Sequence, residues 1–409
     1  MVVTDKKIRG YALKNALAHE GKANSGAVIS GLFAEGLKKE HIKDIIKDVS
    51  KIINEINKLS LEEQKKQFEK LENHIHERET REGLEELPNV KKSGVIMRFA
   101  PSPSGALHIG HAMTSSLSYL YVKKYGGKFY IRIEDTNPEN IYKPAYKLIE
   151  KDVKWLFKDD KKIKIVIQSE RMNLYYKYTE KLLKANSAYI CTCNSEKFKK
   201  FADFKENCPC RNNDLKENLF RWKKMLDKTS EGLKEGEAVV RFKTPEDIGG
   251  MKHPNPAMRD FPLARINETS HPLQKKKYKV WPLMNLSVSV DDIEEKMTHI
   301  IRANEHRDNA KRQEMIFKVL GKEKQFPWTG FLGRFKFKDM ELSASKITQG
   351  IKEGKYSGWD DERLPTLQAL KKKYKPEAFW KFAERIGISE NDKVIDKKEF
   401  FILLDSFNK

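Results

Sequence analysis

The spacing of apolar residues changes from strand-like to helical and back between residues 95 and 133. Residues 95 to 97 are consecutively apolar and predict a buried strand, which Pro101 ends because proline has no amide hydrogen to donate. Apolar side chains recur at helical spacing over residues 107 to 121, and a second apolar strand covers 129 to 133. Strand, turn, helix and strand make half of a doubly wound, Rossmann-like parallel sheet, whose ligands bind beyond the carboxyl ends of the strands.

The pattern outside this region divides the chain into further segments. The first 93 residues are highly charged with a helical period, and Ser60 with Glu63 predicts a capping box at a helix start. The predicted fold class is α/β, with the parallel sheet interrupted by an α+β insertion and flanked by helical modules. The expected segments are a helical appendage over 1–93, the first half of the sheet domain over 94–185, the insertion over 186–260, the second half over 261–330, and a loop with a helical tail over 331–409.

The predicted helix after the first strand begins with two histidines. His108 and His111 are three residues apart, so both imidazoles face one side of the helix, near its free N–H groups and the positive end of its dipole. Such a helix start binds phosphates. Gly110 between them lets a flat base approach the backbone, because glycine has no Cβ. The alternative is two surface histidines that cap a helix.

Composition narrows the class of partner. The chain has 80 Lys and Arg against 59 Asp and Glu, a formal net charge of +21 that suits a polyanion, although a merely basic surface is the alternative. No run of 18 apolar residues occurs, and the N-terminus becomes charged before the apolar core of a signal peptide. We therefore expect a cytoplasmic protein that binds nucleic acid and no membrane.

Four cysteines fall within twenty residues, in two Cys-x-Cys pairs. They are Cys191 with Cys193 and Cys208 with Cys210. In a cytosolic chain such clustering favours a tetrahedral Zn²⁺ site over disulfides, and four thiolates would make the site structural. Four reduced thiols in a loop are the alternative.

The segment RFAPSPSGALHIGH, Arg98 to His111, resembles the HIGH signature of class I aminoacyl-tRNA synthetases. Its lead-in and the later RIEDTNP, Arg132 to Pro138, are similar to the glutamyl and glutaminyl branch, and nearly the whole chain resembles the archaeal type of glutamyl-tRNA synthetase. The resemblance implies a glutamate–tRNA ligase. Such an enzyme activates L-glutamate with ATP and Mg²⁺ and transfers it from the adenylate to the 3′-terminal adenosine of tRNA(Glu).

The resemblance also implies which residues form the ATP site. ELSASKI, 341 to 347, resembles the lysine-containing second signature (KMSKS-type) of the class, here in the archaeal LSTSK form. The implied catalytic residues are His108, His111 and Lys346. The implied ATP contacts are these three together with Pro101, Ser102, Gly110, Ser343 and Ser345.

The same resemblance implies a glutamate pocket. Arg98 would meet a carboxylate of the amino acid, Glu134 its ammonium, and Arg302 the side-chain carboxylate. The alternatives are an ion pair between Arg98 and Glu134 on neighbouring strands, and an exposed helix arginine at 302. The remaining candidates for this pocket are Ser102, Trp281, Asn285 and His306.

Three departures from the family's pattern stand out. Met284 replaces a usual pocket tyrosine, and residues 293 to 296 read IEEK in place of the usual HLLG. The chain ends at Lys409, before the β-barrels that grip the anticodon in relatives. Three explanations stay open: a split gene with a separate anticodon-binding chain, a trimmed sequence, or recognition of the tRNA by its acceptor stem and corner alone. We expect the chain to be a monomer.

Three other functions compete with this interpretation. A tRNA-modifying paralogue of the glutamyl-queuosine type also lacks anticodon barrels, but the helical appendage and the SASKI loop argue against it. A non-catalytic tRNA-binding descendant would explain Met284, but it would not be expected to keep HIGH, Arg98, Glu134 and Lys346. A generic nucleotidyltransferase is disfavoured by the chain length and the second signature.

Overall fold

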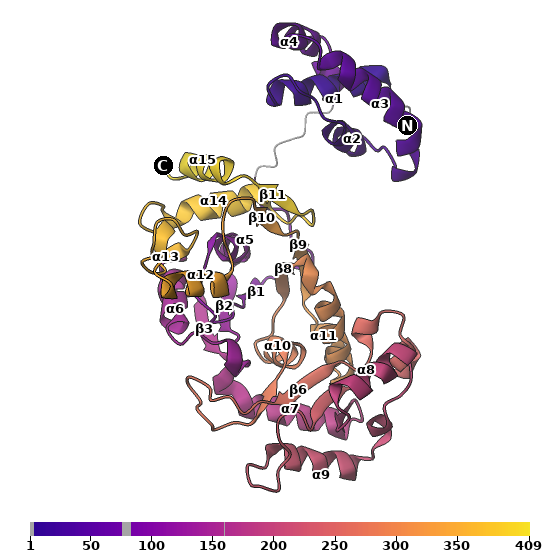
Figure 1. The fold of residues 1–409 in the computed structure, drawn as a ribbon, viewed down its shortest axis with the longest axis vertical. Helices are drawn as coiled ribbons and strands as arrows, with labels where there is room; N and C mark the ends of the chain where they lie inside the picture. The colour runs from indigo at the N-terminus through magenta and orange to yellow at the C-terminus, as the bar shows by residue number, and fades with distance from the viewer. Residues whose placement is uncertain (1–3, 76–82, 159) are drawn as a thin grey trace. The chain divides into compact units, whose positions relative to one another are not determined.

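The computed structural model describes residues 4–75, 83–158 and 160–409, so two parts of the predicted appendage, 1–3 and 76–82, lie outside the described residues. The chain divides into two compact units, residues 1–82 and 83–409, each with its own core (Figure 1). Among the described residues, no helix combines the length and the apolar character that crossing a membrane requires.

The N-terminal unit is helical, as its periodicity predicts. Its helices are α1 (Asp5–Ala18), α2 (Ser25–Ala34), α3 (Ile42–Ile56) and α4 (Leu61–Glu69). The predicted capping box is confirmed, because Ser60 accepts from the Glu63 backbone while the Glu63 carboxylate accepts from the Ser60 N–H at 2.9 Å. A Cβ at Gly31 would lie 2.3 Å from the Tyr11 ring, so glycine allows α1 and α2 to approach closely.

The larger unit is built on parallel strands. β1 (Val95–Phe99), β2 (Gly127–Ile133) and β3 (Ile163–Ile167) form one sheet in that order, and β8 (His299–Ala303) pairs with β9 (Trp328–Leu332). Thr298 joins the two sheets, because its N–H donates to Ile96 O at 3.0 Å. The helix α5 (Ile109–Tyr125) connects β1 to β2 and packs on them, which confirms the predicted strand, turn, helix and strand.

A four-stranded antiparallel sheet follows β3 along the chain. Its strands are β4 (Ala188–Cys191), β5 (Val239–Phe242), β6 (Pro262–Ile266) and β7 (Val280–Pro282), in that order. Helices α7 (Met172–Lys184), α8 (Ser195–Phe204) and α9 (Leu215–Leu226) accompany it (Figure 1). Because β6 and β7 lie beyond residue 260, this sheet spans the segment boundary expected there.

The remaining elements return the chain to the parallel strands. They are α6 (Ala145–Leu156), α10 (Met284–Glu294), α11 (Arg307–Val319), β10 (Phe335–Phe337), α12 (Ala344–Lys352), α13 (Leu367–Leu370), α14 (Pro376–Ile386), β11 (Lys393–Ile395) and α15 (Lys397–Phe407). The helical tail packs back on the first half of the sheet domain, since Phe379 and Phe382 of α14 belong to the same buried cluster as Leu117 of α5. Residues far apart in sequence therefore build one core behind the turn that follows β1.

Candidate active site

Two stacked histidines open α5 at the carboxyl end of β1. The rings of His108 and His111 lie 3.8 Å apart between centroids, with 22° between their planes. His108 Nδ1 accepts from the Gly110 N–H at 3.1 Å, and His111 Nδ1 accepts from the His108 N–H at 3.3 Å. Because each Nδ1 is an acceptor, each neutral ring carries its proton on Nε2.

Burial keeps both histidines neutral. It lowers the pKa of His108 well below its ordinary value, with a further contribution from His111, and it lowers the pKa of His111 to about 4. At neutral pH the pair therefore offers two Nε2–H donors without net charge. A Cβ at Gly110 would lie 3.1 Å from His108 Cε1, so glycine also keeps room for the His108 ring.

The tail of the chain clamps this turn, a relationship that no local sequence pattern indicates. The Ile109 N–H donates to Pro365 O at 3.0 Å, and the Leu367 N–H donates to Leu107 O at 2.8 Å. Between them, Thr366 is fully buried and forms an isolated β-bridge with His108. The short segment 365–367 thus fixes the backbone of the HIGH motif.

A buried carboxyl group supports the same junction. Asp152 of α6 accepts from Gln368 Nε2 at 2.5 Å and from the Leu107 backbone. Burial raises the pKa of Asp152 to about 7, against the opposing effect of Lys371. Asp152 therefore links the turn, through Leu107, to the tail, through Gln368.

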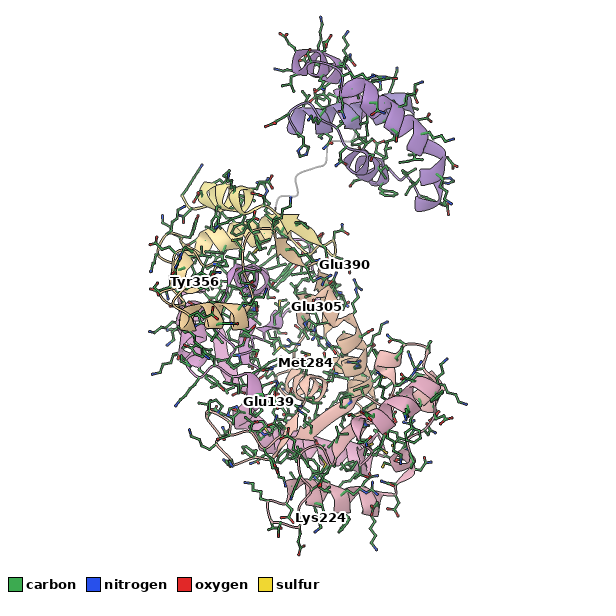
Figure 2. All side chains as sticks on the ribbon, in the orientation of Figure 1. Glu139, Lys224, Met284, Glu305, Tyr356 and Glu390 are labelled. Atoms are coloured by element: carbon green, nitrogen blue, oxygen red, sulfur yellow. The ribbon has the colours of Figure 1, made fainter. Side chains whose placement is uncertain are left out.

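Most of the predicted glutamate-binding residues line a cavity of about 280 Å³ at the carboxyl ends of the strands. Met284, the first residue of α10, is labelled in Figure 2 and lines the same cavity. The polar and ionisable side chains that line it are Arg98, Ser102, Thr114, Ser118, Glu134, Arg302 and His306. Trp281 and Asn285 are not among the lining residues: Trp281 is buried and stacks on His271 at 4.9 Å, and Asn285 is buried in α10.

Arg98 is paired with Asp292 rather than with Glu134. Its Nε and Nη2 donate to the two Asp292 oxygens at 2.8 and 3.2 Å, and both side chains are buried. Its Nη1 makes no hydrogen bond to a described side chain. Burial opposes ionisation of Asp292, but Arg98 and Arg132 outweigh it and lower the pKa of this carboxyl group. The arginine is thereby held with one nitrogen uncommitted beside the cavity.

The IEEK departure has a structural reason in the same network. Fully buried Arg132 donates to Asp292 Oδ1 at 2.7 Å and also to Glu295, so Glu295 balances its charge. Lys296 adopts φ +57°, in the left-handed region that favours glycine, and glycine is the residue usual in the resembling family. The departure therefore places a buried carboxylate beside Arg132 and a lysine in a left-handed backbone conformation.

Arg302 is a buried cation that can donate a further hydrogen bond. Its Nη1 donates to Gln313 Oε1 at 2.8 Å, while its buried Nε has no partner among the described residues. Burial, and secondarily Arg98, lowers the pKa of Arg302 to about 10, so it stays charged at neutral pH. The alternative of an exposed helix arginine is wrong, because Arg302 lies in β8 and only 9% of it is exposed.

Glu134 directly follows β2 and faces these arginines. Burial raises the pKa of Glu134, and Arg98, Arg132 and Arg302 oppose that rise. Its N–H donates to Pro101 O at 2.9 Å, so the turn after β1 and the end of β2 are tied together. One carboxyl group and two buried guanidinium groups thus meet at one cavity, a charge pattern complementary to an amino acid with two carboxylates.

The second signature lies beside a neighbouring cavity of about 850 Å³, whose lining includes Ser102, Ser343 and Ser345. Ser343 and Ser345 share a hydrogen bond of 2.9 Å between their hydroxyl groups, and Ser343 caps α12. Lys346 is exposed and forms an ion pair with Glu341 at 3.1 Å. Ser102 lines this cavity and the glutamate-sized one, so the two adjoin at that side chain.

The four cysteines come together as free thiols between β4 and the turn before α9. Their sulfur atoms all lie within 4.8 Å of one another, with Cys193 and Cys208 at 3.4 Å and Cys191 and Cys208 at 3.6 Å. Tetrahedral zinc with Zn–S bonds of about 2.3 Å separates its sulfurs by about 3.8 Å, so the donor set fits this metal. A hydrogen bond from Cys208 lowers the pKa of Cys191 to about 5, which favours a thiolate.

The chain is similar to known proteins. Residues 94–404 match the family of tRNA synthetases class I (E and Q), catalytic domain. The chain is 44% identical over 390 residues to the Glutamate–tRNA ligase of Methanocaldococcus jannaschii, covering 95% of this chain and 68% of that one. It is 42% identical over 398 residues to the Glutamate–tRNA ligase of Pyrococcus furiosus, covering 94% and 67%.

A solved structure agrees on the fold. The crystal structure of glutamate-tRNA synthetase from Elizabethkingia anophelis aligns with a TM-score of 0.52 and 19% identity, covering 76% of this chain and 70% of that one. The paired histidines, the clamped turn and the family match over 94–404 together lead to one assignment. The chain belongs to the class I tRNA synthetases of the glutamyl and glutaminyl family.

Proposed function

We propose that the chain is a glutamate–tRNA ligase. The observation that carries the choice of glutamate is buried Arg302, whose Nε has no partner in the described part of the chain and which lines one cavity with Arg98 and Glu134. A buried cation of this kind binds a second carboxylate strongly, because an unpaired charge in that setting is costly. The relatives named Glutamate–tRNA ligase support the same reaction.

The charged pocket residues each bind a different charged group of the amino acid. Glu134 anchors the α-ammonium, Arg98 meets the α-carboxylate, and Arg302 reads the side-chain carboxylate. Ser102 lies where the two cavities adjoin, between the amino acid and ATP. Trp281 and Asn285 act from the packed layer behind the pocket, since both are buried and neither lines it.

Activation joins the glutamate carboxylate to the α-phosphate of ATP and releases pyrophosphate. The neutral Nε2–H donors of His108 and His111 and the N-terminus of α5 stabilise negative charge on the phosphates. Pro101 and Gly110 shape the turn around the nucleotide, and Ser343, Ser345 and Lys346 approach the phosphates from the opposite side. Mg²⁺, bound with ATP, supplies charge neutralisation on the departing pyrophosphate.

The second step transfers the activated acyl group to the terminal ribose of tRNA(Glu). The antiparallel-sheet region is proposed to hold the acceptor stem, and the N-terminal helices to contact the tRNA. The formal charge of +21 supports a polyanionic partner. Because the product serves protein synthesis, we propose the cytoplasm as its compartment and a monomer as its working state.

We also propose that Cys191, Cys193, Cys208 and Cys210 hold a structural zinc ion. Four thiolates fill a tetrahedral shell and leave no position for substrate. The metal would tie β4 to the turn at Pro209–Asn212, far from the reacting groups in sequence.

Pyrophosphate exchange tests the proposed function. Glutamate and glutamine are each assayed with and without tRNA. We expect exchange only in the reaction that contains both glutamate and tRNA. Absence of exchange in all four reactions overturns the enzyme assignment. Periodate-oxidised tRNA provides the second test: the ligase fails to charge it, whereas continued glutamate attachment would identify a tRNA-modifying activity.

A further inference from the structure

A second polar cavity lies at the opposite edge of the parallel strands. It has a volume of about 580 Å³, within the usual range for small-molecule sites. Its residues belong to three segments that precede or begin β1, β8 and β9. The lining includes Lys91, Lys296, His299, Lys324, Phe326 and Trp328. We call it the amino-end pocket, because parallel strands place their amino ends at one edge and their carboxyl ends, with the active site, at the other.

The described lining of the amino-end pocket carries positive charge that no acidic lining residue balances. Lys91, Lys296 and Lys324 each come from a different segment, and none forms an ion pair with a described residue. None of the described residues that line the pocket is acidic. His299 adds no charge, because burial lowers its pKa and its Nε2 lies 2.8 Å from Pro88 O. Three ammonium groups without counterions favour a multiply charged anion.

Two aromatic rings, together with Ile96 and Met297, form the apolar part of the lining. Phe326 and half-buried Trp328 line the amino-end pocket and also a neighbouring cavity of about 510 Å³. That neighbouring cavity adds Arg307 and Lys311, with Glu314 as its one acidic member among the described residues. A basic groove that carries flat aromatic faces is the combination used to bind nucleotides by stacking and phosphate contact.

We propose that the amino-end pocket binds a phosphorylated nucleotide, with the base on Trp328 and Phe326 and the phosphate among the three lysines. The ligand is either a free nucleotide or one nucleotide of an RNA, because both present the same base and phosphate. The site is separate from the HIGH and SASKI cavities, since it shares no lining residue with them.

The test compares the full chain with the variant K91Q/K296Q/K324Q. A matched control, K147Q/K151Q/K161Q, removes three exposed lysines of the larger unit, two of them on α6. Equilibrium dialysis with labelled ATP should give two nucleotides per wild-type or control chain and one per K91Q/K296Q/K324Q chain. If the ligand is instead RNA, all three proteins bind one ATP per chain. The affinity for a single-stranded adenosine hexamer then falls at least tenfold, and the salt dependence of log K loses a slope of about 2.

Two further measurements keep the outcome decisive. W328A should lower the affinity for the same ligand. Polyglutamate is the second probe. If its binding is lost in the lysine variant but unchanged in W328A, the pocket is an acidic-peptide site and the proposal is overturned. Equal binding of ATP and RNA by wild type, lysine variant and control also overturns it. Glutamate-dependent pyrophosphate exchange at saturating tRNA should persist in the lysine variant, which separates this inference from the proposed function and shows that the variant is folded.

Discussion

Arg98 and Asp292 form a two-pronged buried ion pair across 194 residues of sequence. Arg132 donates to the same carboxylate, so Asp292 holds two arginines that end neighbouring strands. The carboxylate therefore orients the cation that faces the amino acid, and it does so without lining the cavity itself.

Replacing Asp292 with Asn should destabilise the larger unit by about 3 kcal/mol or more, because it leaves two buried cations uncompensated. Chemical unfolding measures this loss, and the KM for glutamate should rise in whatever fraction remains folded. Asp203→Asn, an exposed carboxylate on α8, is the control. Equal stability of the two variants would contradict the positioning role.

Arg302→Gln should lower kcat/KM for glutamate about 100-fold, equivalent to about 3 kcal/mol, since hydrogen bonds to charged groups contribute on this scale. Exposed Arg385→Gln provides the control. Steady-state exchange kinetics at varied glutamate concentration measure the effect. Unchanged kinetics would show that another residue reads the side-chain carboxylate.

Lys346→Ala should lower kcat about 100-fold and leave the KM for glutamate unchanged, because the lysine acts on charge that develops at the phosphates. Lys338→Ala, also exposed and close in sequence, is the control. Glu341→Gln removes the ion-pair partner of Lys346 and should leave kcat within a few-fold of wild type. A rise in the glutamate KM with constant kcat would place Lys346 at the amino acid instead.

Asp152 makes stability depend on pH. Its folded pKa of about 7 lies above the unfolded value near 3.9, so its contribution is complete at low pH and is lost as pH rises through 7. As the pH rises from 5.5 to 7.5, the free energy of unfolding of the wild type should fall by about 2 kcal/mol relative to that of Asp152→Asn. Paired urea titrations at both pH values measure the difference, and parallel behaviour of the two proteins would contradict it.

Metal removal tests the cysteine site. The purified chain should contain one zinc ion, and chelation or Cys208→Ser should remove it and lower the Tm of the larger unit, because metal binding and folding are coupled. Elemental analysis with thermal unfolding measures both effects. Four reduced thiols that bind no added zinc would support the alternative.

Local patterns predicted the elements around the site well. Strand, turn, helix and strand over 95–133 and the capping box at Ser60 follow from short-range periodicity and side-chain chemistry, and the structure confirms both. Clustering of the cysteines also follows from sequence spacing, since fewer than twenty residues connect the two pairs.

The partners that orient the site were not predictable in this way. Asp292 and residues 365–367 reach the turn only through tertiary packing, and no periodic pattern records such distant contacts. Trp281 shows the converse limit: it belongs to the implied stretch, but strand alternation in β7 turns its ring into the core beside His271.

The clamp at Pro365 and Leu367 has a consequence for synthesis of the chain. The HIGH turn leaves the ribosome roughly 250 residues before the segment that hydrogen-bonds to it, an interval of roughly 10 to 50 s at ordinary elongation rates. During that interval the nascent turn lacks two of its backbone partners. The HIGH turn therefore completes its backbone hydrogen bonds late in translation, when the tail emerges, and a chain stalled before residue 365 carries the turn without them.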